Sequence, residues 1–203
     1  MKLFLDCDQT LYRNNSLEEN IRSRMVLFMK EHFGEEAEVV NKIRADYLRR
    51  YGSTLAGLMI HEKIDPRKFV DYVHDVDLTL YLSPNPVLRD VLESLTCPIY
   101  IASNAPRFHV ESILKVLGVD HIPLKVFSIE SFGYEGKPNH SSYRHLLEQT
   151  STMPGEAMLV DDYTLNLRGA REVGFATCLI GNEEWEPRLE RLELISSLPG
   201  ITH

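Results

Sequence analysis

The chain has 203 residues, enough for one ordinary domain or for a core with a small insertion, and its formal net charge is −8 at pH 7. This acidic balance argues against a nucleic-acid polymer as partner, because binding a polyphosphate requires a basic face. No apolar run approaches the ~20 residues that span a bilayer, and an aspartate at position 6 makes a signal peptide unexpected. A cytoplasmic protein without a membrane partner is therefore expected, with reduced thiols at Cys7, Cys97 and Cys178.

The first predicted element is a short apolar strand, Leu3–Leu5, which runs into Asp6, Asp8 and Thr10. A buried strand has no structural use for charge at its end, because unpaired carboxylates cost free energy away from water. Ligands do bind at the carboxyl ends of strands in open α/β sheets. Two aspartates two positions apart suit a nucleophile and a partner acid/base, although an isolated Asp-x-Asp-x-Thr motif is common by chance.

Residues 14–85 contain no convincing strand and are predicted to form a small helical domain. A capping box at Ser16-x-x-Glu19 predicts the start of its first helix, and Gly34 predicts the end. Apolar residues at helical spacing predict three further helices, over residues 40–51, 55–59 and 65–73, before Pro84 and Pro86 close the segment. Because the segment follows the acidic strand end directly, it is predicted to be a cap over that end. A helical insertion packed elsewhere is the alternative.

The remaining chain alternates between strand and helix patterns. Continuous apolar runs, typical of parallel strands covered on both faces, recur at residues 99–102, 157–160 and 176–180, with a weaker run at 126–129. Of the helical patterns between them, one begins at Pro106 and ends at Gly118, one contains Tyr143, and one leads to Gly174.

This alternation predicts an α/β fold with a doubly wound parallel sheet. The sheet domain is expected to comprise residues 1–13 and 86–203, with residues 14–85 as the inserted helical cap. Residues 185–203 show a helical pattern and are predicted to form a terminal helix with a frayed end.

Polar residues also follow the later strands. Ser103 and Asn104 come after one strand, where a helix cap is the commoner use of such a pair. Lys137 lies in a loop between Gly136 and Pro138, and a single loop lysine is usually a solvated charge. The stronger signal is Asp161-Asp162 at the end of a fully apolar strand, followed by Asn166, because adjacent carboxylates there are costly without a cation or a lysine.

A parallel sheet brings the ends of its strands to one edge, so Asp6, Asp8, Asp161 and Asp162 are expected to converge. Two unit charges ~4 Å apart repel by about 4 kcal/mol at an effective dielectric of 20, so the four groups need compensation. Mg²⁺, which oxygen ligands and a substrate phosphate bind, would provide it, together with Lys137. Separate surface aspartates that each cap a helix would require four coincidences.

At this point the residues resemble a known family. Four stretches, in the family's order, are similar to the motifs of haloacid-dehalogenase-like (HAD) phosphohydrolases: Asp6-x-Asp8-x-Thr10-Leu11, Ser103-Asn104, Lys137-Pro138 and Asp161-Asp162-x-x-x-Asn166. Within the superfamily, the chain resembles the pyrimidine 5'-nucleotidase branch at Leu11-Tyr12, at residues 51–58 and at Val73-His74-Asp75. It departs from that branch at Gln9, Arg13 and Gly136, which bears on the choice of substrate.

The resemblance implies a mechanism. Asp6 would attack the substrate phosphorus to give an aspartyl-phosphate, and Asp8 would act as general acid and then as general base. Mg²⁺ would be held by the Asp6 carboxylate, the Asp8 backbone carbonyl and Asp162. Asp161 would steady Lys137 or a water on the metal.

The resemblance also implies residues that support the site and bind the substrate. Ser103, the Asn104 amide and Lys137 would hold phosphate oxygens, while Thr10 and Asn166 would support the loops around them. Three residues of the helical segment are candidates for contacts with a base or ribose: Tyr51, Thr54 and His74. Core packing of Tyr51 and a solvated His74 are at least as common.

The expected function is a Mg²⁺-dependent phosphomonoesterase for a small phosphorylated metabolite, with a (pyrimidine) nucleoside 5'-monophosphate favoured. The alternatives are a phosphatase or mutase for another small phosphate, such as phosphoglycolate or a sugar phosphate. A 2-haloacid dehalogenase would leave Asp8 and the Asp161-Asp162 pair unexplained, and a non-catalytic binding module would not need intact acids. A monomer or dimer is expected.

Overall fold

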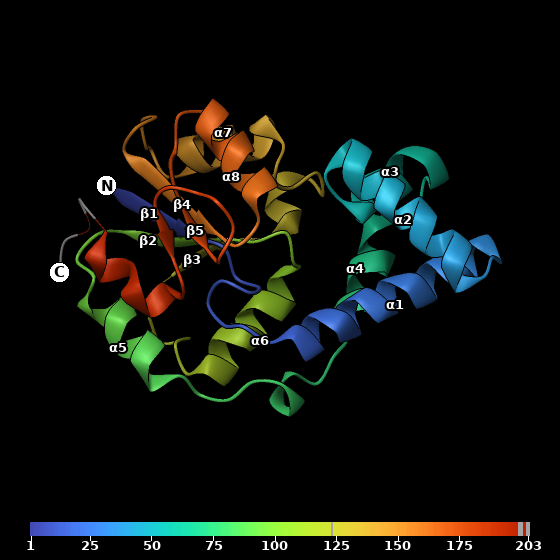
Figure 1. The fold of residues 1–203 in the computed structure, drawn as a ribbon, viewed down its shortest axis with the longest axis horizontal. Coiled ribbons are helices and arrows are strands. Elements are labelled where there is room, and N and C mark those ends of the chain that lie inside the picture. Colours follow the sequence, from blue (N-terminus) through green and yellow to red (C-terminus); the bar gives the residue numbers. More distant parts are fainter. Residues whose placement is uncertain (123, 199–200, 202–203) are drawn as a thin grey trace. The chain divides into compact units, whose positions relative to one another are not determined.

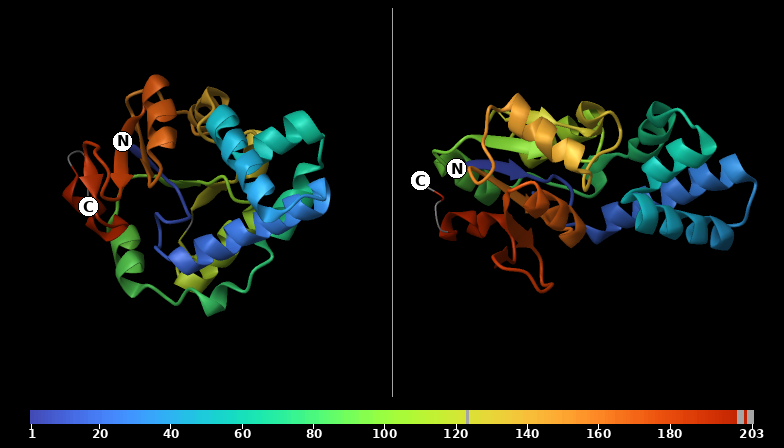
Figure 2. Two further views of the ribbon diagram at one scale, coloured as in Figure 1. Left: turned by 45° about the vertical axis from the view of Figure 1, so that its right-hand side comes forward. Right: turned by 90° about the horizontal axis from the view of Figure 1, so that it is seen from above.

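A computed structural model of the protein describes residues 1–122, 124–198 and 201. The chain divides into two compact units, one formed by Met1–Arg13 with Leu82–His203 and the other by Asn14–Tyr81. Figure 1 and Figure 2 show the first unit as strands flanked by helices and the second as helices alone. Each unit is built around its own buried side chains.

The first unit contains a six-stranded sheet in the order β3-β2-β1-β4-β5-β6, in which every neighbouring pair is parallel. This sheet, with helices on both sides, confirms the predicted doubly wound α/β fold. The order reverses at β1, and in sheets of this kind ligands bind where the order reverses, beyond the carboxyl ends of the strands. The strands are β1 (Lys2–Leu5), β2 (Ile99–Ala102), β3 (Lys125–Phe127), β4 (Ala157–Asp161), β5 (Ala176–Ile180) and β6 (Arg188–Leu189).

Helices cover both faces of this sheet, and Figure 1 shows α7 and α8 on one side of the strands and α5 and α6 on the other. Their bounds are α5 (Pro86–Ser94), α6 (Arg107–Leu117), α7 (His140–Gln149) and α8 (Thr164–Glu172), with short 3₁₀ helices η2 (Ile129–Phe132) and η3 (Leu192–Ser197). Coverage on both faces explains why the strands are continuous apolar runs.

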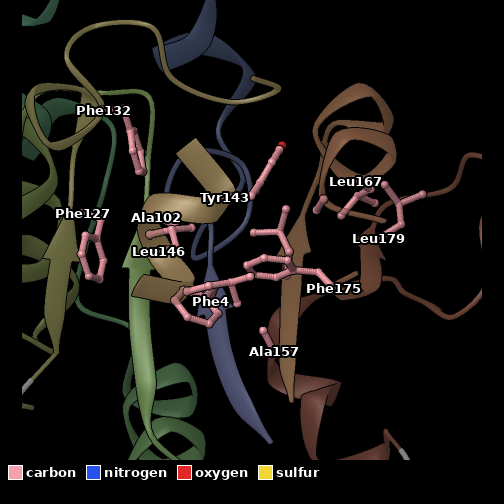
Figure 3. Close-up of a cluster of buried hydrophobic side chains, with 13 residues drawn as sticks. Phe4, Ala102, Phe127, Phe132, Tyr143, Leu146, Ala157, Leu167, Phe175 and Leu179 are labelled. Atoms are coloured by element: carbon pink, nitrogen blue, oxygen red, sulfur yellow. The ribbon is translucent and has the colours of Figure 1, made fainter. Parts of the chain in front are cut away.

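A hydrophobic core lies between the sheet and the helices α7 and α8 (Figure 3). The ring of Phe4 stacks on Tyr100 with centroids 5.0 Å apart and meets Phe175 edge-on at 5.5 Å. Tyr143 of α7 contacts Phe175 at 5.8 Å, so the helix and the central strand share one aromatic cluster. This packing holds the ends of β1 and β4 in place.

The second unit consists of α1 (Asn15–Phe33), α2 (Ala37–Tyr51), α3 (Thr54–Glu62), α4 (Pro66–His74) and η1 (Leu78–Leu80). As predicted, α1 ends at Gly34, which adopts the left-handed conformation with φ of 67°. The helix predicted over residues 65–73 is α4, in which Asp65 is the N-cap and Pro66 is the first residue. The capping box at Ser16 is wrong, because Asn14 is the N-cap and its side chain accepts the Leu17 N–H at 2.9 Å.

Three other expectations differ from the structure. Pro86 begins the unpredicted helix α5 rather than closing a helical segment. The run at 126–129 ends as a strand at Phe127, and Ile129 begins η2. The predicted terminal helix is wrong, since the tail contains β6 and the 3₁₀ helix η3; residues 199–200 and 202–203 lie outside the described residues.

Among the described residues, each helix is too short or too polar to cross a membrane.

Candidate active site

Asp6 and Asp161 lie side by side at the carboxyl edge of the two central strands. Leu5 pairs with Val160 in the parallel register of β1 and β4, so the next residue of each strand is an aspartate. The Asp6 N–H extends this ladder by donating to the Val160 carbonyl at 2.9 Å. The register therefore brings together two carboxylates that are far apart in the sequence, at the point where the strand order reverses.

Lys137 bridges these two carboxylates. Its Nζ donates to Asp6 Oδ1 at 2.8 Å and to Asp161 Oδ2 at 2.6 Å, and the lysine is 1% exposed. Burial lowers the pKa of Lys137, but attraction to Asp161 and Asp6 outweighs that effect and raises the pKa above its ordinary value. Lys137 therefore stays charged, and it is an internal counter-ion rather than a solvated loop lysine.

The side chain of Asn104 holds Lys137 at this place. Its Oδ1 accepts the Lys137 N–H at 2.8 Å, and its Nδ2 donates to the Lys137 carbonyl at 2.7 Å. Asn104 follows β2, so one amide side chain ties the lysine loop to the end of a neighbouring strand. The structure thus engages the side-chain amide of Asn104 with the backbone of Lys137, and the predicted contact of the Asn104 amide with phosphate stays a prediction.

Gly136 has no side chain, and this allows the loop that carries Lys137 to approach Asn104 closely. Substitution of Gly136 by alanine tests this requirement. Its φ is +67°, and an added Cβ would lie 2.5 Å from Asn104 Oδ1 and 2.7 Å from Ile129 Cδ1. Gly133→Ala is a matched control, because Gly133 has φ of +61° but no atom within 4 Å of an added Cβ. Both variants should lose about 1–2 kcal/mol from the left-handed backbone, and Gly136→Ala roughly 1–3 kcal/mol more from overpacking. Urea unfolding measures the free energy of unfolding of both variants. Equal losses of stability would contradict the close contact between Gly136 and Asn104.

Asp161 is fully buried, and its remaining hydrogen bonds come from α8. Asn166 Nδ2 donates to both of its carboxylate oxygens at 3.0 and 3.1 Å, and the Tyr163 N–H donates to Oδ1 at 2.9 Å. Tyr143 in turn donates its hydroxyl to the Asn166 carbonyl at 2.7 Å. These contacts, together with the ion pair to Lys137, fix the orientation of the Asp161 carboxylate.

Asp162 completes a cluster of three carboxylates. Asp6, Asp161 and Asp162 each offer an oxygen, and these atoms all lie within 4.8 Å of one another. Burial and the neighbouring Asp161 carboxylate raise the pKa of Asp162 to about 7, and burial raises the pKa of Asp6 well above its usual range despite Lys137. When all three carboxyls are ionised, the single Lys137 ammonium leaves two negative charges uncompensated, and this repulsion adds to burial in raising two of the pKa values. An all-oxygen donor set with that deficit fits a hard divalent cation such as Mg²⁺.

Asp8 lies on the loop after β1 and touches two residues that the sequence analysis does not identify as site residues. The Tyr12 hydroxyl donates to Asp8 Oδ1 at 2.6 Å, and His109 Nε2 of α6 lies 3.4 Å from the same oxygen. Burial raises the pKa of the Tyr12 phenol, so it remains a proton donor. A tyrosine four residues after Asp8 is the one signal that the sequence offers for this contact.

Ser103 and Thr10 are both buried, Ser103 directly after β2 and Thr10 on the loop after β1. The Ser103 Oγ accepts the Ala105 N–H at 3.0 Å, which leaves the hydroxyl proton for another acceptor. Thr10 Oγ1 lies 3.5 Å from Asp6 Oδ2, at the outer limit of a hydrogen bond. The Ser103 hydroxyl can therefore donate to a ligand, while Thr10 lies within the loop that carries Asp6 and Asp8.

Comparisons with known proteins agree with this geometry. A profile described as haloacid dehalogenase-like hydrolase matches residues 3–174, which is most of the chain. The chain belongs to the haloacid dehalogenase-like hydrolase family. Its six-stranded parallel sheet and the acids at its edge are accordingly those of a HAD-family hydrolase.

Individual relatives of this HAD hydrolase are distant. Phosphate metabolism protein 8 of Saccharomyces cerevisiae is 22% identical over 210 residues, and the match covers 93% of this chain and 64% of that protein. A HAD phosphatase from Thermococcus onnurineus has a TM-score of 0.63 at 16% identity, over 100% of this chain and 99% of its own. The L-2-haloacid dehalogenase of Xanthobacter autotrophicus has a TM-score of 0.56 at 16% identity, over 91% and 79%. These structural likenesses show the fold alone.

The three substrate candidates of this HAD hydrolase lie in the helical unit, apart from the acids in sequence. The Tyr51 hydroxyl and His61 Nε2 are 2.6 Å apart, Thr54 is buried at the start of α3, and His74 Nδ1 lies 2.9 Å from the Val70 carbonyl. Each of these residues packs against or contacts other residues of the helical unit, so its position does not by itself indicate a contact with substrate. Their role with substrate stays a prediction.

Proposed function

We propose that this HAD hydrolase is a Mg²⁺-dependent phosphomonoesterase that acts through an aspartyl-phosphate on Asp6. The observation that carries the proposal is the buried Lys137 ammonium between Asp6 and Asp161, with Asp162 completing a cluster of three acids. A site with that many carboxylates and a fixed lysine suits a substrate that is itself an anion and brings a cation with it.

In this proposal Asp6 attacks the phosphorus in line, so that a bond forms from a carboxylate oxygen to phosphorus while the bond to the leaving oxygen breaks. Asp8 gives its proton to that leaving oxygen. Asp8, now a carboxylate, takes a proton from a water molecule as this water attacks the phosphorus of the aspartyl-phosphate. Phosphate then departs and Asp6 is regenerated.

The remaining residues bind and orient the phosphoryl group. Lys137 and the Ser103 hydroxyl would hold its oxygens, and Asn104 would keep the Lys137 backbone in place for that contact. Mg²⁺, held by the carboxylates of Asp6 and Asp162 and by the Asp8 backbone carbonyl, would neutralise charge on the transferring group. Asp161 would orient Lys137, which it contacts at 2.6 Å.

A nucleoside 5'-monophosphate is the favoured substrate class, and a pyrimidine nucleotide in particular. Support comes from the resemblance of residues 51–58 and of Val73-His74-Asp75, which include Tyr51, Thr54 and His74, to the pyrimidine 5'-nucleotidase branch. An aromatic ring such as that of Tyr51 can stack on a base. The chain spans 64% of the yeast phosphate metabolism protein that it resembles, so the activity of that whole protein is a proposal for this one.

A substrate screen tests this proposal. Phosphate release is measured from UMP, CMP, purine nucleoside monophosphates, phosphoglycolate and sugar phosphates, first with Mg²⁺ and then with a chelator. Chelator-sensitive release that is fastest with UMP and CMP supports the proposal. Rapid release from sugar phosphates with all nucleotides ignored would overturn the nucleotide part, and chelator-resistant halide release from a 2-haloacid would overturn the phosphatase itself.

Mg²⁺ binding should depend on pH through Asp162. Because a pKa of about 7 leaves roughly one in ten of these carboxyls ionised at pH 6, the affinity for Mg²⁺ should be about tenfold weaker at pH 6 than at pH 8. At 100 times its dissociation constant the ion should stabilise the fold by about 2.7 kcal/mol. Titration calorimetry and thermal unfolding measure both effects. Asp162→Asn should weaken the pH dependence and remove most of the binding, and affinity that is flat from pH 6 to 8 in the unaltered protein would contradict this assignment.

A further inference from the structure

Two side chains from different parts of the sheet unit meet at one oxygen of Asp8. Tyr12 follows Asp8 by four residues and donates its hydroxyl to Oδ1 at 2.6 Å. His109, in the first turn of α6, places Nε2 3.4 Å from the same atom. The His109 side chain is 1% exposed, whereas that of Asp8 is 33% exposed, so a buried imidazole contacts a carboxyl that is partly open to solvent.

We propose that Tyr12 and His109 are positioning residues that hold the Asp8 carboxyl in the orientation required for proton transfer. The inference rests on the proposed phosphatase reaction, in which Asp8 protonates the leaving oxygen. It adds two residues, neither of which touches the phosphoryl group, and it assigns them to the step that Asp8 performs.

The geometry of the contacts supports this role. A carboxyl on a half-exposed side chain can rotate, and proton transfer requires its oxygen to come within about 2.6–3.2 Å of its partner. A hydrogen bond to Oδ1 from a tyrosine on the same loop, with an imidazole against the same atom, restricts that rotation. Because Oδ1 accepts the Tyr12 proton, the proton that Asp8 exchanges is assigned to Oδ2.

The position of His109 is hard to explain by packing alone. Its helix otherwise buries only apolar residues, namely Val110, Ile113, Leu114 and Leu117. A buried imidazole costs free energy unless polar neighbours compensate, and a leucine or methionine would fill a purely apolar space. One polar contact of His109 is with the Asp8 carboxylate, whose Oδ1 lies 3.4 Å from Nε2.

Tyr12→Phe tests the proposal, because it removes the hydroxyl and keeps the ring. Two aryl phosphates of similar size are compared in single-turnover experiments with Mg²⁺: phenyl phosphate, whose leaving oxygen is basic and needs a proton, and 4-nitrophenyl phosphate, whose leaving oxygen does not. We expect phenol release to slow by at least about tenfold, since positioned general acids contribute 10²–10⁴-fold. Release of 4-nitrophenolate should change less than about twofold, and the KM for both substrates should stay the same.

Two further variants sharpen the comparison. Tyr100→Phe removes a hydroxyl from another packed tyrosine of the same sheet, whose ring stacks on Phe4, and should leave both substrates unaffected. His109→Gln should slow phenol release with the same selectivity as Tyr12→Phe. A crystal structure of Tyr12→Phe should show the Asp8 carboxyl rotated from its present orientation.

Other outcomes would overturn the inference. An equal loss on both aryl phosphates in Tyr12→Phe would assign Tyr12 to binding or folding instead, and an unmoved Asp8 carboxyl in the variant structure would contradict the positioning role whatever the kinetics. If the unaltered protein hydrolyses UMP while Tyr12→Phe matches it on every substrate, only this inference fails. If the unaltered protein hydrolyses no phosphomonoester at all, the proposed function fails and this inference with it.

Discussion

Asp6→Asn should abolish phosphate release while leaving the fold intact. An amide cannot form the aspartyl-phosphate, and loss of the nucleophile from a covalent mechanism can cost on the order of 10⁶-fold in kcat. We therefore expect kcat with the best substrate to fall by more than about 10⁴-fold. The Asn side-chain oxygen can still accept the Lys137 hydrogen bond that Asp6 Oδ1 accepts at 2.8 Å, so circular dichroism and the cooperativity of unfolding should be preserved.

Asp90→Asn is the matched control, because Asp90 pairs with Arg89 on the exposed surface of the same unit. It should retain full turnover. Mg²⁺ titration of Asp6→Asn separates the roles of the carboxylate: a catalyst should lose turnover yet still bind the ion through its remaining ligands. If Asp6→Asn still turned over at a tenth of the original rate, Asp6 would not be the nucleophile and the proposed mechanism would fail.

The central part of this site could be predicted from the sequence because its geometry follows from strand register. Asp6 and Asp161 each end an apolar strand, and parallel neighbours must present their carboxyl ends at one edge. Burial then explains why Lys137 is needed, since two carboxylates cannot stay charged there without a cation. The strand register thus predicts the two acids and their need for a cation, whereas the place of Lys137 beside them depends on the loop that carries it.

The edge strand β6 and the exact start of α1 were harder to predict, because the local sequence signals for them are weak. The two-residue strand β6 has no periodicity of its own and exists through pairing with β5, where the Gly181 N–H donates to the Leu189 carbonyl at 2.9 Å. At the start of α1, Asn14 and Ser16 are both good capping residues, and the Asn14 side chain is the one that accepts the Leu17 N–H. Periodicity cannot choose between such neighbours.

Contacts between polar residues that are far apart in the sequence could not be predicted, for a different reason. The residue types at Asn104 and His109 are compatible with a phosphate ligand, a helix cap or a buried support, and only tertiary structure distinguishes these uses. Both polar atoms of the Asn104 side-chain amide form hydrogen bonds with the Lys137 backbone, and His109 Nε2 lies 3.4 Å from Asp8 Oδ1. The sequence therefore identifies which residues gather at the site more readily than which of them face the substrate.

Lys137→Met should destabilise the protein strongly as well as inactivate it. Methionine approximates the length of the lysine but removes the ammonium, which leaves Asp6 and Asp161 buried without their counter-ion. Breaking a buried ion pair by removing one partner typically costs about 3–5 kcal/mol. The pH dependence follows from the pKa of Asp6, which burial already raises in the unaltered protein and which would rise further without Lys137. An acid with a raised pKa in the folded state loses stability as pH rises, so the deficit should be small at pH 4 and larger at pH 8.

Lys42→Met provides the comparison, because Lys42 Nζ lies 2.8 Å from Glu38 Oε1, the same distance as Lys137 Nζ from Asp6 Oδ1, but on an exposed helix surface. Exposed pairs of this kind typically contribute about 0.3–0.5 kcal/mol, so this variant should unfold almost as the unaltered protein does at every pH. Urea unfolding of both variants at pH 4, 6 and 8 measures the contrast. Added Mg²⁺ should recover part of the stability of Lys137→Met at pH 8, because a divalent cation at the same carboxylates replaces some of the missing positive charge. A Lys137→Met protein as stable as Lys42→Met at pH 8 without Mg²⁺ would mean that the carboxylates take up protons or water at little cost, and the requirement for a buried cation at this sheet edge would no longer hold.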